Sequence, residues 1–170
     1  MIRIGAKQET GPLALLKECH RRIERFLYVL ITIYRQAHGG ELSEEQREAM
    51  KTALRYFQNA APKHTQDEEE SLFPRMRGLA TIDALDALEQ DHEIVEESHS
   101  QVGKLCERWL DQGYLDLTEA VRLGERLCTL SARYHRHIRV EEQDIFPLAC
   151  HILPPDQLED VRREMADRRH

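Results

Sequence analysis

Apolar residues recur every three or four positions along four long stretches of the chain, which is the spacing of amphipathic helices. The first stretch begins at Thr10-Gly11-Pro12, where proline is tolerated in a first turn, and ends at His38-Gly39-Gly40, where glycine favours a helix C-terminus. We expect one face of this helix to be buried. Its apolar residues are Leu13, Leu16, Ile23, Phe26, Leu27, Leu30 and Ile31.

The second stretch opens with a capping-box pattern, in which Ser43 is followed three residues later by Gln46. Pro62 lies inside the stretch. Because proline lacks a backbone N–H and crowds the preceding turn, we expect a kink near His64. The buried face is expected to include Leu54, Phe57, Ala61 and Leu72.

The third stretch follows a break at Gly78, and either Thr81 or Asp83 is a suitable N-cap for it. It runs to about Leu110 and stops at Asp111-Gln112-Gly113.

The fourth stretch is expected to be capped by Thr118 and to end near Phe146-Pro147 or about one turn later. After Pro154-Pro155, a short polar tail helix is expected from Asp156 to about Asp167. The buried side of the fourth helix is expected to include Val121, Leu123, Leu127, Leu130 and Ile138.

These elements define an all-α fold. Glycine and proline supply only 8 and 6 of the 170 residues, and runs of β-branched residues are short, so helix is favoured throughout. We predict a single domain over residues 1–170. Its core is an up-down-up-down four-helix bundle over about residues 12–150, followed by a short C-terminal helix at 155–168.

Composition excludes several classes of function. A net charge of −7 argues against nucleic acid, which favours basic surfaces. No apolar stretch reaches the length of a membrane span, and the N-terminus lacks a signal-peptide core. We therefore expect a cytoplasmic protein with no nucleic-acid or membrane partner. The four cysteines are widely spaced without a C-x-x-C pair, and we expect them to be buried as small apolar residues.

The most specific pattern in the chain is H-x-x-x-E-E-x-x-[LI]-F-P, which occurs at residues 64–74 and again at 137–147, 73 residues apart. Each copy is preceded, 44 or 45 residues earlier, by another histidine with a glutamate four positions on. One such pair in a helix carries little information, because Glu at this spacing is common. The repetition is what indicates a shared site.

The turns bring the four histidines to one level. In an antiparallel pair of helices, residues that lie level are equidistant from the turn. The midpoint of His20 and His64 falls at position 42, and that of His64 and His92 at position 78. The midpoint of His92 and His137 falls beside the turn at Gly113. All three positions are turns, so the histidines are expected to converge in the bundle.

Residues four apart share a helix face, so each histidine and its glutamate point in one direction. Burying unpaired carboxylates costs several kcal/mol or more each, and bound cations would remove that cost. Mixed imidazole and carboxylate donors favour iron or manganese, and zinc also fits. The candidate metal ligands are His20, Glu24, His64, Glu68, His92, Glu96, His137 and Glu141.

Within this set, Glu24 and Glu96 rest on spacing and the repeat alone, and the alternative for both is an outer-shell or solvated position. Glu69 and Glu142 also recur, but they point about 100° away, so we expect them to lie on the helix surface or to contact a ligand from outside. The remaining candidates have structural alternatives. His99 could line an access route, and Tyr28 could lie near the metals, although an ordinary core tyrosine is favoured. Phe73 and Phe146 are expected to pack at the bundle end, each followed by a proline that limits its helix.

At these residues the chain resembles the hemerythrin-like proteins of the HHE cation-binding type. The pattern H…H-x-x-x-E…H…H-x-x-x-E spans roughly residues 13–148. The resemblance implies a four-helix bundle with a non-haem di-iron centre bridged by Glu68 and Glu141. By the same resemblance His20 and His64 bind one metal, and the third-helix and fourth-helix histidines, His92 and His137, bind the other.

The chain departs from the oxygen-carrying members at two ligands. Those carriers have a further histidine where this chain has Glu96, and their fourth-helix bridging residue is a later aspartate rather than Glu141. Extra carboxylate stabilises ferric over ferrous iron, which argues against reversible oxygen carriage. Family members in bacteria are associated with oxygen, nitric oxide or peroxide handling, with iron sensing and with repair of iron–sulfur centres.

Three hypotheses follow. The first is a di-iron protein that binds or reacts with a small diatomic or peroxide ligand, with binding alone and turnover both compatible with the residues. The second is an iron- or oxygen-responsive sensor, or an interaction module, whose metal occupancy is recognised by a protein partner of unknown identity. The third is a plain helical bundle with incidental histidines.

Overall fold

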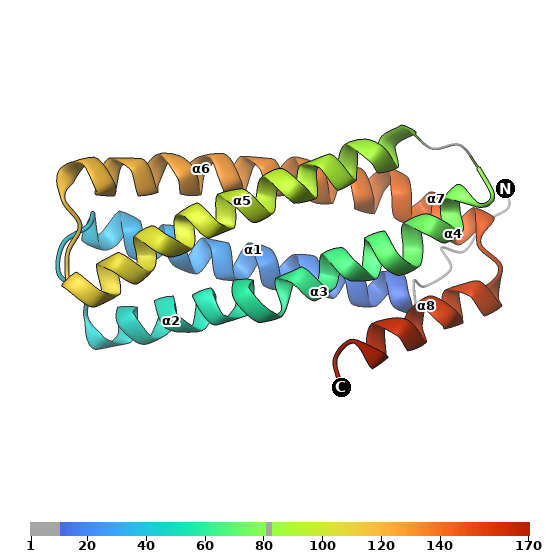
Figure 1. The fold of residues 1–170 in the computed structure, drawn as a ribbon, viewed down its shortest axis with the longest axis horizontal. Helices are drawn as coiled ribbons and strands as arrows, with labels where there is room; N and C mark the ends of the chain where they lie inside the picture. Colours follow the sequence, from blue (N-terminus) through green and yellow to red (C-terminus); the bar gives the residue numbers. More distant parts are fainter. Residues whose placement is uncertain (1–10, 81–82) are drawn as a thin grey trace, which may run out of the picture.

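The structure is a computed structural model that describes residues 11–80 and 83–170, so Thr10 and Thr81 lie outside it. Within these ranges every regular element is a helix (Figure 1), which confirms the all-α class. The elements are α1 (Pro12–Ala37), α2 (Glu44–Asn59), α3 (Ala61–Gln66), η1 (Asp67–Leu72), α4 (Phe73–Arg77), α5 (Asp83–Gln112), α6 (Leu117–Val140), η2 (Glu141–Ile145), α7 (Phe146–Ile152) and α8 (Pro155–Asp167).

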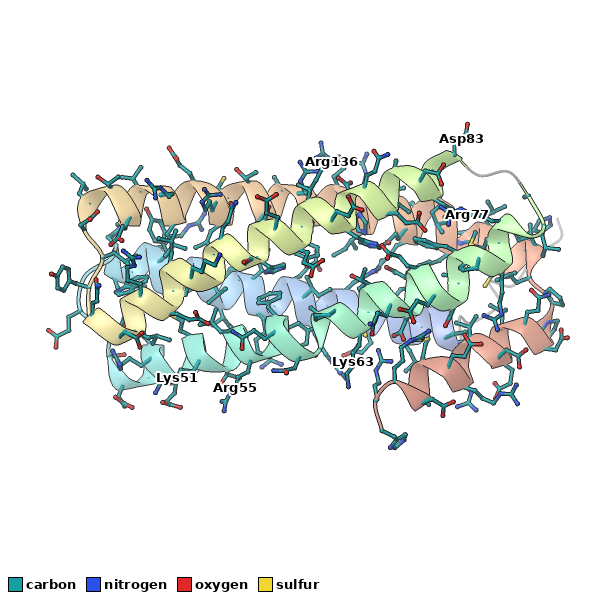
Figure 2. All side chains as sticks on the ribbon, in the orientation of Figure 1. Lys51, Arg55, Lys63, Arg77, Asp83 and Arg136 are labelled. Atoms are coloured by element: carbon teal, nitrogen blue, oxygen red, sulfur yellow. The ribbon has the colours of Figure 1, made fainter. Side chains whose placement is uncertain are left out.

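The long helical segments lie side by side along the longest axis, and consecutive segments reverse direction (Figure 1). The segment from α2 to α4 runs opposite to α1, and α5 runs opposite to that segment. The segment from α6 to α7 runs opposite to α5. Helices α1 and α6 also contact each other, whereas α8 packs across one end against α1 and η1. Charged side chains such as Lys51, Arg55 and Arg136 point away from the bundle (Figure 2).

Capping boxes mark the starts of two long helices, α2 and α6. The predicted capping box of Ser43 and Gln46 is confirmed at α2. At α6 the prediction of Thr118 was wrong, because Asp116 caps this helix in a reciprocal pair with Glu119. The helix therefore starts earlier, and Val121, predicted to be buried, is exposed because it lies on the outer face.

Two segments of the bundle are π-helices, in which each backbone N–H donates five residues back instead of four. The N–H of Phe73 donates to the carbonyl of Glu68 at η1, and the N–H of Phe146 donates to the carbonyl of Glu141 at η2. The prolines that follow were expected to limit the helices, yet α4 runs on to Arg77 and α7 to Ile152. The wider turn explains this, because proline's missing N–H and crowding ring are tolerated there.

The expected kink near His64 corresponds to a break one turn earlier. Helix α2 ends at Asn59, and Pro62 lies in the first turn of α3, where its missing N–H costs no hydrogen bond. The site-bearing segment is thus assembled from α3 and η1 rather than from one continuous helix.

The apolar core has two parts. The larger cluster fills the half of the bundle nearest the α1–α2 turn and includes Leu27, Met50 and Trp109. The smaller cluster lies toward the other end and includes Phe73, Phe146 and, from α8, Val161 and Met165. Of the cysteines, the expected burial holds for Cys106, whereas Cys19 is half-buried and Cys128 and Cys150 are exposed. No helix among the described residues is long and apolar enough to cross a membrane.

Candidate metal centre

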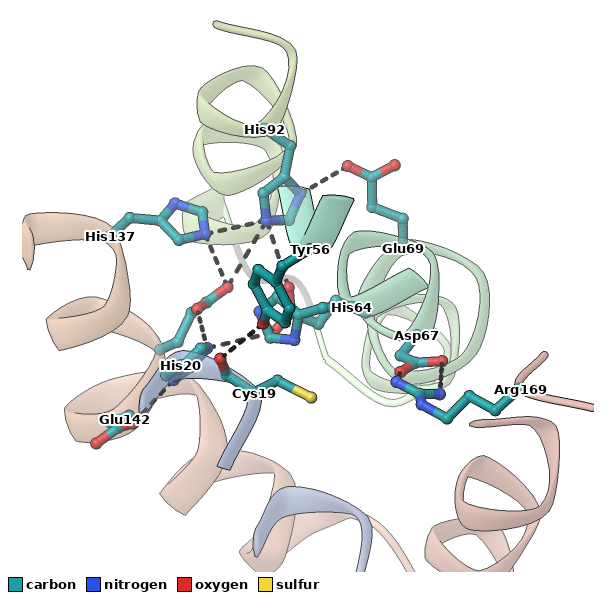
Figure 3. Close-up of polar contacts among 12 residues, drawn as sticks. Cys19, His20, Tyr56, His64, Asp67, Glu69, His92, His137, Glu142 and Arg169 are labelled. Carbon is teal, nitrogen blue, oxygen red and sulfur yellow. Dashed lines mark hydrogen bonds and ion pairs between the residues drawn. The ribbon is translucent and has the colours of Figure 1, made fainter. Parts of the chain in front are cut away.

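Four helices each contribute one buried histidine to the interior between the two apolar clusters. His20 comes from α1, His64 from α3, His92 from α5 and His137 from α6, and their imidazoles point toward one another (Figure 3). The ring centroids of His20 and His64 lie 4.8 Å apart, and those of His92 and His137 lie 4.6 Å apart. This is the common level that the positions of the turns predicted.

The two π-helices bring a carboxylate from each side. Glu68 in η1 and Glu141 in η2 are both fully buried. Together with the histidines they form two overlapping groups, in each of which the donor atoms lie within 4.8 Å of one another. One group contains His20, His64, Glu68 and Glu141, and the other contains His92, His137, Glu68 and Glu141. The two carboxylates belong to both groups, which is the arrangement that a bridged pair of metals requires.

Every histidine turns its Nε2 atom toward these carboxylates. Nε2 of His20 lies 3.0 Å from Glu141, and Nε2 of His137 lies 3.0 Å from the same side chain. Nε2 of His64 lies 3.5 Å from Glu68, and Nε2 of His92 lies 3.3 Å from it. The inner faces of all four rings therefore meet at the carboxylates, where each Nε2 could bind a metal.

The outer Nδ1 atoms meet a second set of carboxylates. Nδ1 of His20 lies 2.8 Å from Oε1 of Glu142, and Nδ1 of His92 lies 2.7 Å from Oε1 of Glu69. Both glutamates were expected to lie on the surface or to contact ligands from outside, and they make the latter contact. A carboxylate at Nδ1 fixes the ring orientation and leaves the lone pair on Nε2. Asp91, 3.7 Å from Nδ1 of His137, is a further member that the sequence pattern did not indicate.

The ionisable groups have strongly divergent pKa values. Burial and the charge of Glu141 hold the pKa of Glu68 well above its ordinary range. Burial acts on Glu141 in the same direction, but the imidazoles of His137 and His20 outweigh it and lower the pKa of Glu141. Burial also holds the pKa of His64 well below 6.5. Two carboxylates this close and this dry do not both ionise without a cation.

Several buried donor atoms at the centre lack hydrogen-bond partners within the described part of the chain, as expected of ligands for a cation. Among the described residues, both oxygens of Glu68 and of Glu141 are buried and accept no hydrogen bond of favourable geometry. Such an unpaired acceptor costs about 1–3 kcal/mol. The Nε2 atoms of His92 and His137 face each other at 3.0 Å. When Nδ1 of His92 carries the ring proton and donates a hydrogen bond to Glu69, Nε2 of His92 has a lone pair and no proton. A metal ion satisfies such nitrogen and oxygen donors together.

Glu24 and Glu96, two of the eight candidate ligands, are exposed and belong to neither group. The buried stripe of α1 passes through His20, Ile23 and Leu27, so its spacing averages three and a half residues. A position four residues after the histidine then lies at the edge of the stripe, and the same holds for Glu96 on α5. Tyr28 is also exposed, so it does not lie near the centre, and the expectation of an ordinary core tyrosine was wrong as well.

A surface pocket and a small internal cavity share lining residues beside the histidines. A cavity of about 10 Å³ lies among the four histidines and is also lined by Val95 and Tyr134. It shares both residues, and His92, with a surface pocket of about 340 Å³ between α3 and α5. His99, the predicted route residue, lines this pocket together with Glu96. Tyr134, whose hydroxyl lies 2.8 Å from Nε2 of His99, was not predicted, although its position three residues before His137 places it on the same face.

The repeated phenylalanines pack against the site as well as the bundle end. Phe146 stacks on His20 with ring centroids 5.6 Å apart, and Phe73 stacks on His92 at 6.3 Å. Both phenylalanines are fully buried. They exclude water from one side of the centre, which lowers the local dielectric constant and strengthens binding of a cation to carboxylates.

Over residues 11–149 the sequence matches the protein family described as the hemerythrin HHE cation binding domain. A protein of Haemophilus influenzae, described as an uncharacterized protein, is 30% identical to the chain over 162 residues. That alignment covers 93% of this chain and 90% of the relative. The family match contains both donor groups and ends before α8.

Proposed function

The chain belongs to the hemerythrin HHE cation-binding domain family, and on that premise we propose that it is a non-haem di-iron protein built on an up-down-up-down four-helix bundle. It binds or reacts with oxygen, nitric oxide or peroxide. The observation that carries the proposal is the pair of buried donor groups that share Glu68 and Glu141. Two imidazoles and two carboxylates for each metal suit iron, and manganese and zinc accept the same donors.

In this proposal each residue has a defined part. His20 and His64 hold one metal, His92 and His137 hold the other, and Glu68 and Glu141 bridge them. Glu142 and Glu69 keep the rings of His20 and His92 turned inward. When bound, the two metals would supply the redox chemistry and bind the small ligand.

The cavity among the histidines supports a small ligand. Its volume of about 10 Å³ leaves little space beyond that which the metals would take, which favours a ligand of a few atoms over a larger substrate. Tyr134 lines both this cavity and the surface pocket, and its hydroxyl lies 2.8 Å from Nε2 of His99, so this pair can donate or accept a hydrogen bond beside an entering ligand.

A sensor is the second candidate, and one observation favours it. Helix α8 lies beyond the family match and packs on η1, the segment that carries Glu68. A change of metal occupancy at Glu68 could therefore alter a surface element that a protein partner recognises.

Ligand-dependent absorption tests the first candidate. Protein loaded with iron under argon is mixed with azide, nitric oxide or hydrogen peroxide, and its visible spectrum is recorded. We expect new charge-transfer bands that saturate with ligand and are lost in Glu141→Gln. Glu24→Gln is the matched control, and it should keep the wild-type response because Glu24 is exposed. An iron-loaded protein whose visible spectrum does not change with any of the three ligands would contradict the proposal and favour the sensor.

A further inference from the structure

Asp67 is a fully buried carboxylate that lies outside both donor groups. It directly precedes Glu68 in η1, and it is held by two arginines from the C-terminal end of the chain (Figure 3 shows one). Arg169 donates to Oδ2 of Asp67 at 2.5 Å and to Oδ1 at 3.2 Å, which is a two-pronged pairing. Arg168 donates to Oδ1 at 3.0 Å. A bidentate arginine–carboxylate pair fixes the orientation of the carboxylate as well as neutralising its charge.

The contact extends along η1. Arg168 also donates to the hydroxyl of Ser71 at 2.8 Å. Arg75, just after η1, pairs with Glu164 of α8 at 2.7 Å and 3.2 Å. On the apolar side, Val161 and Met165 of α8 are buried in the smaller core cluster. Polar and apolar contacts together fix α8 against the π-helix.

The second copy of the repeated motif has no carboxylate at the position that corresponds to Asp67. The position of Asp67 is occupied by Val140, which packs against the smaller apolar cluster. Only one of the two bridging candidates is therefore connected to the tail. Arg169 also lines a surface pocket together with Cys19. Cys19 directly precedes His20.

We propose that α8, together with Arg168 and Arg169 that follow it, forms a latch for the metal centre. The two arginines hold Asp67 so that the neighbouring Glu68 faces the metals. Asp67 and the two arginines are positioning residues. The inference rests on the proposed function, because it concerns the affinity of the same site. If docking of α8 favours binding of metal, binding of metal must favour docking of α8 by the same factor.

The test compares two double variants of the full chain. R168A/R169A removes the arginines that hold Asp67. R162A/R163A is the matched control, because it removes two nearby arginines of α8 whose partners, Glu159 and Asp160, also lie on α8. Iron(II) affinity is measured under argon by competition with a chelator. Hydrogen exchange of the backbone amides of residues 155–167 is measured with and without iron.

We expect R168A/R169A to bind iron about 10–100-fold more weakly than the wild type, as for other residues that orient ligands, and the control to match the wild type. R168K/R169K keeps the charge but loses the fork, so its affinity should lie between these values. In the wild type, iron should slow exchange in α8, an effect that a merely structural contact would not produce.

Three outcomes overturn the latch. The first is equal iron affinity in R168A/R169A and the control. The second is exchange in α8 of the wild type that iron leaves unchanged, a result that stands even if a variant fails to fold. In both cases wild-type iron binding would leave the proposed function intact. The third is a wild type that binds no iron, which would overturn the proposed function and the latch together.

Discussion

Glu68 is a carboxylate whose charge depends on what lies beside it. Without a cation, burial and the nearby Glu141 raise its pKa well above the ordinary range, so it tends to keep its proton. A bound metal reverses this balance, because the cation favours the carboxylate form. The raised pKa of Glu68 favours the neutral acid in the metal-free centre, whereas a bound metal would favour the anionic ligand.

The substitution Glu68→Gln separates these two states. We expect loss of two-metal binding, because an amide does not replace a bridging carboxylate. The metal-free variant should unfold with a free energy within about 1 kcal/mol of the wild type, because glutamine resembles the protonated acid in shape and hydrogen bonding. Elemental analysis and urea denaturation measure the two effects. Retention of two metals in Glu68→Gln would contradict the bridging role.

His99 makes the stability of the metal-free protein depend on pH. Burial lowers its pKa to about 4, whereas the unfolded chain has a histidine pKa of about 6.5. Between these values the unfolded chain binds more protons than the folded one. The free energy of unfolding therefore falls as the pH falls from about 6.5 to 4, by up to about 3 kcal/mol.

His99→Gln should remove this part of the pH dependence and leave that of the other groups. Urea denaturation of metal-free wild type and variant at pH 7 and pH 4 measures the difference. Equal losses of stability in the two proteins would show that His99 does not stay neutral in the fold.

At the scale of the element, the start of α6 offers a direct test of the cap. Asp116 accepts the N–H of Glu119 at 2.8 Å, so Asp116→Ala should lower the free energy of unfolding by about 1 kcal/mol. Thr118 is exposed inside the first turn and makes no such bond, so Thr118→Ala serves as the control and should change little. Chemical denaturation distinguishes the two. A larger effect at Thr118 would restore the assignment that the sequence favoured.

The same scale shows what the sequence predicts and what it does not. Long helices, the cap at Ser43 and the level of the four histidines follow from local rules of spacing and turns. The π-helices do not, because a wide turn depends on how the flanking segments pack. The recurring Phe-Pro pair was the available signal, since a proline inside a continuing helix needs such a turn. The burial of Glu68 and the exposure of Glu24 likewise depend on how the buried face rotates around each helix along its length.

At the scale of the molecule, the centre lies between two apolar clusters and is connected to the tail by Arg168 and Arg169, which directly follow α8. Tertiary contacts of this kind are invisible to helix periodicity, so the sequence indicated α8 as a polar helix without showing that it packs on η1. The ion pairs with Asp67 could not be predicted, because the partners are 101 and 102 residues apart.

The measurement that tests the central claim most directly is iron per chain, by elemental analysis of protein purified without chelator from iron-supplied cells. Two shared donor groups predict close to two irons per chain in the wild type. Glu24→Gln should keep that value, and Glu141→Gln should lose it. A wild type with intact helical circular dichroism and little or no metal would contradict the di-iron account and leave the bundle as a scaffold.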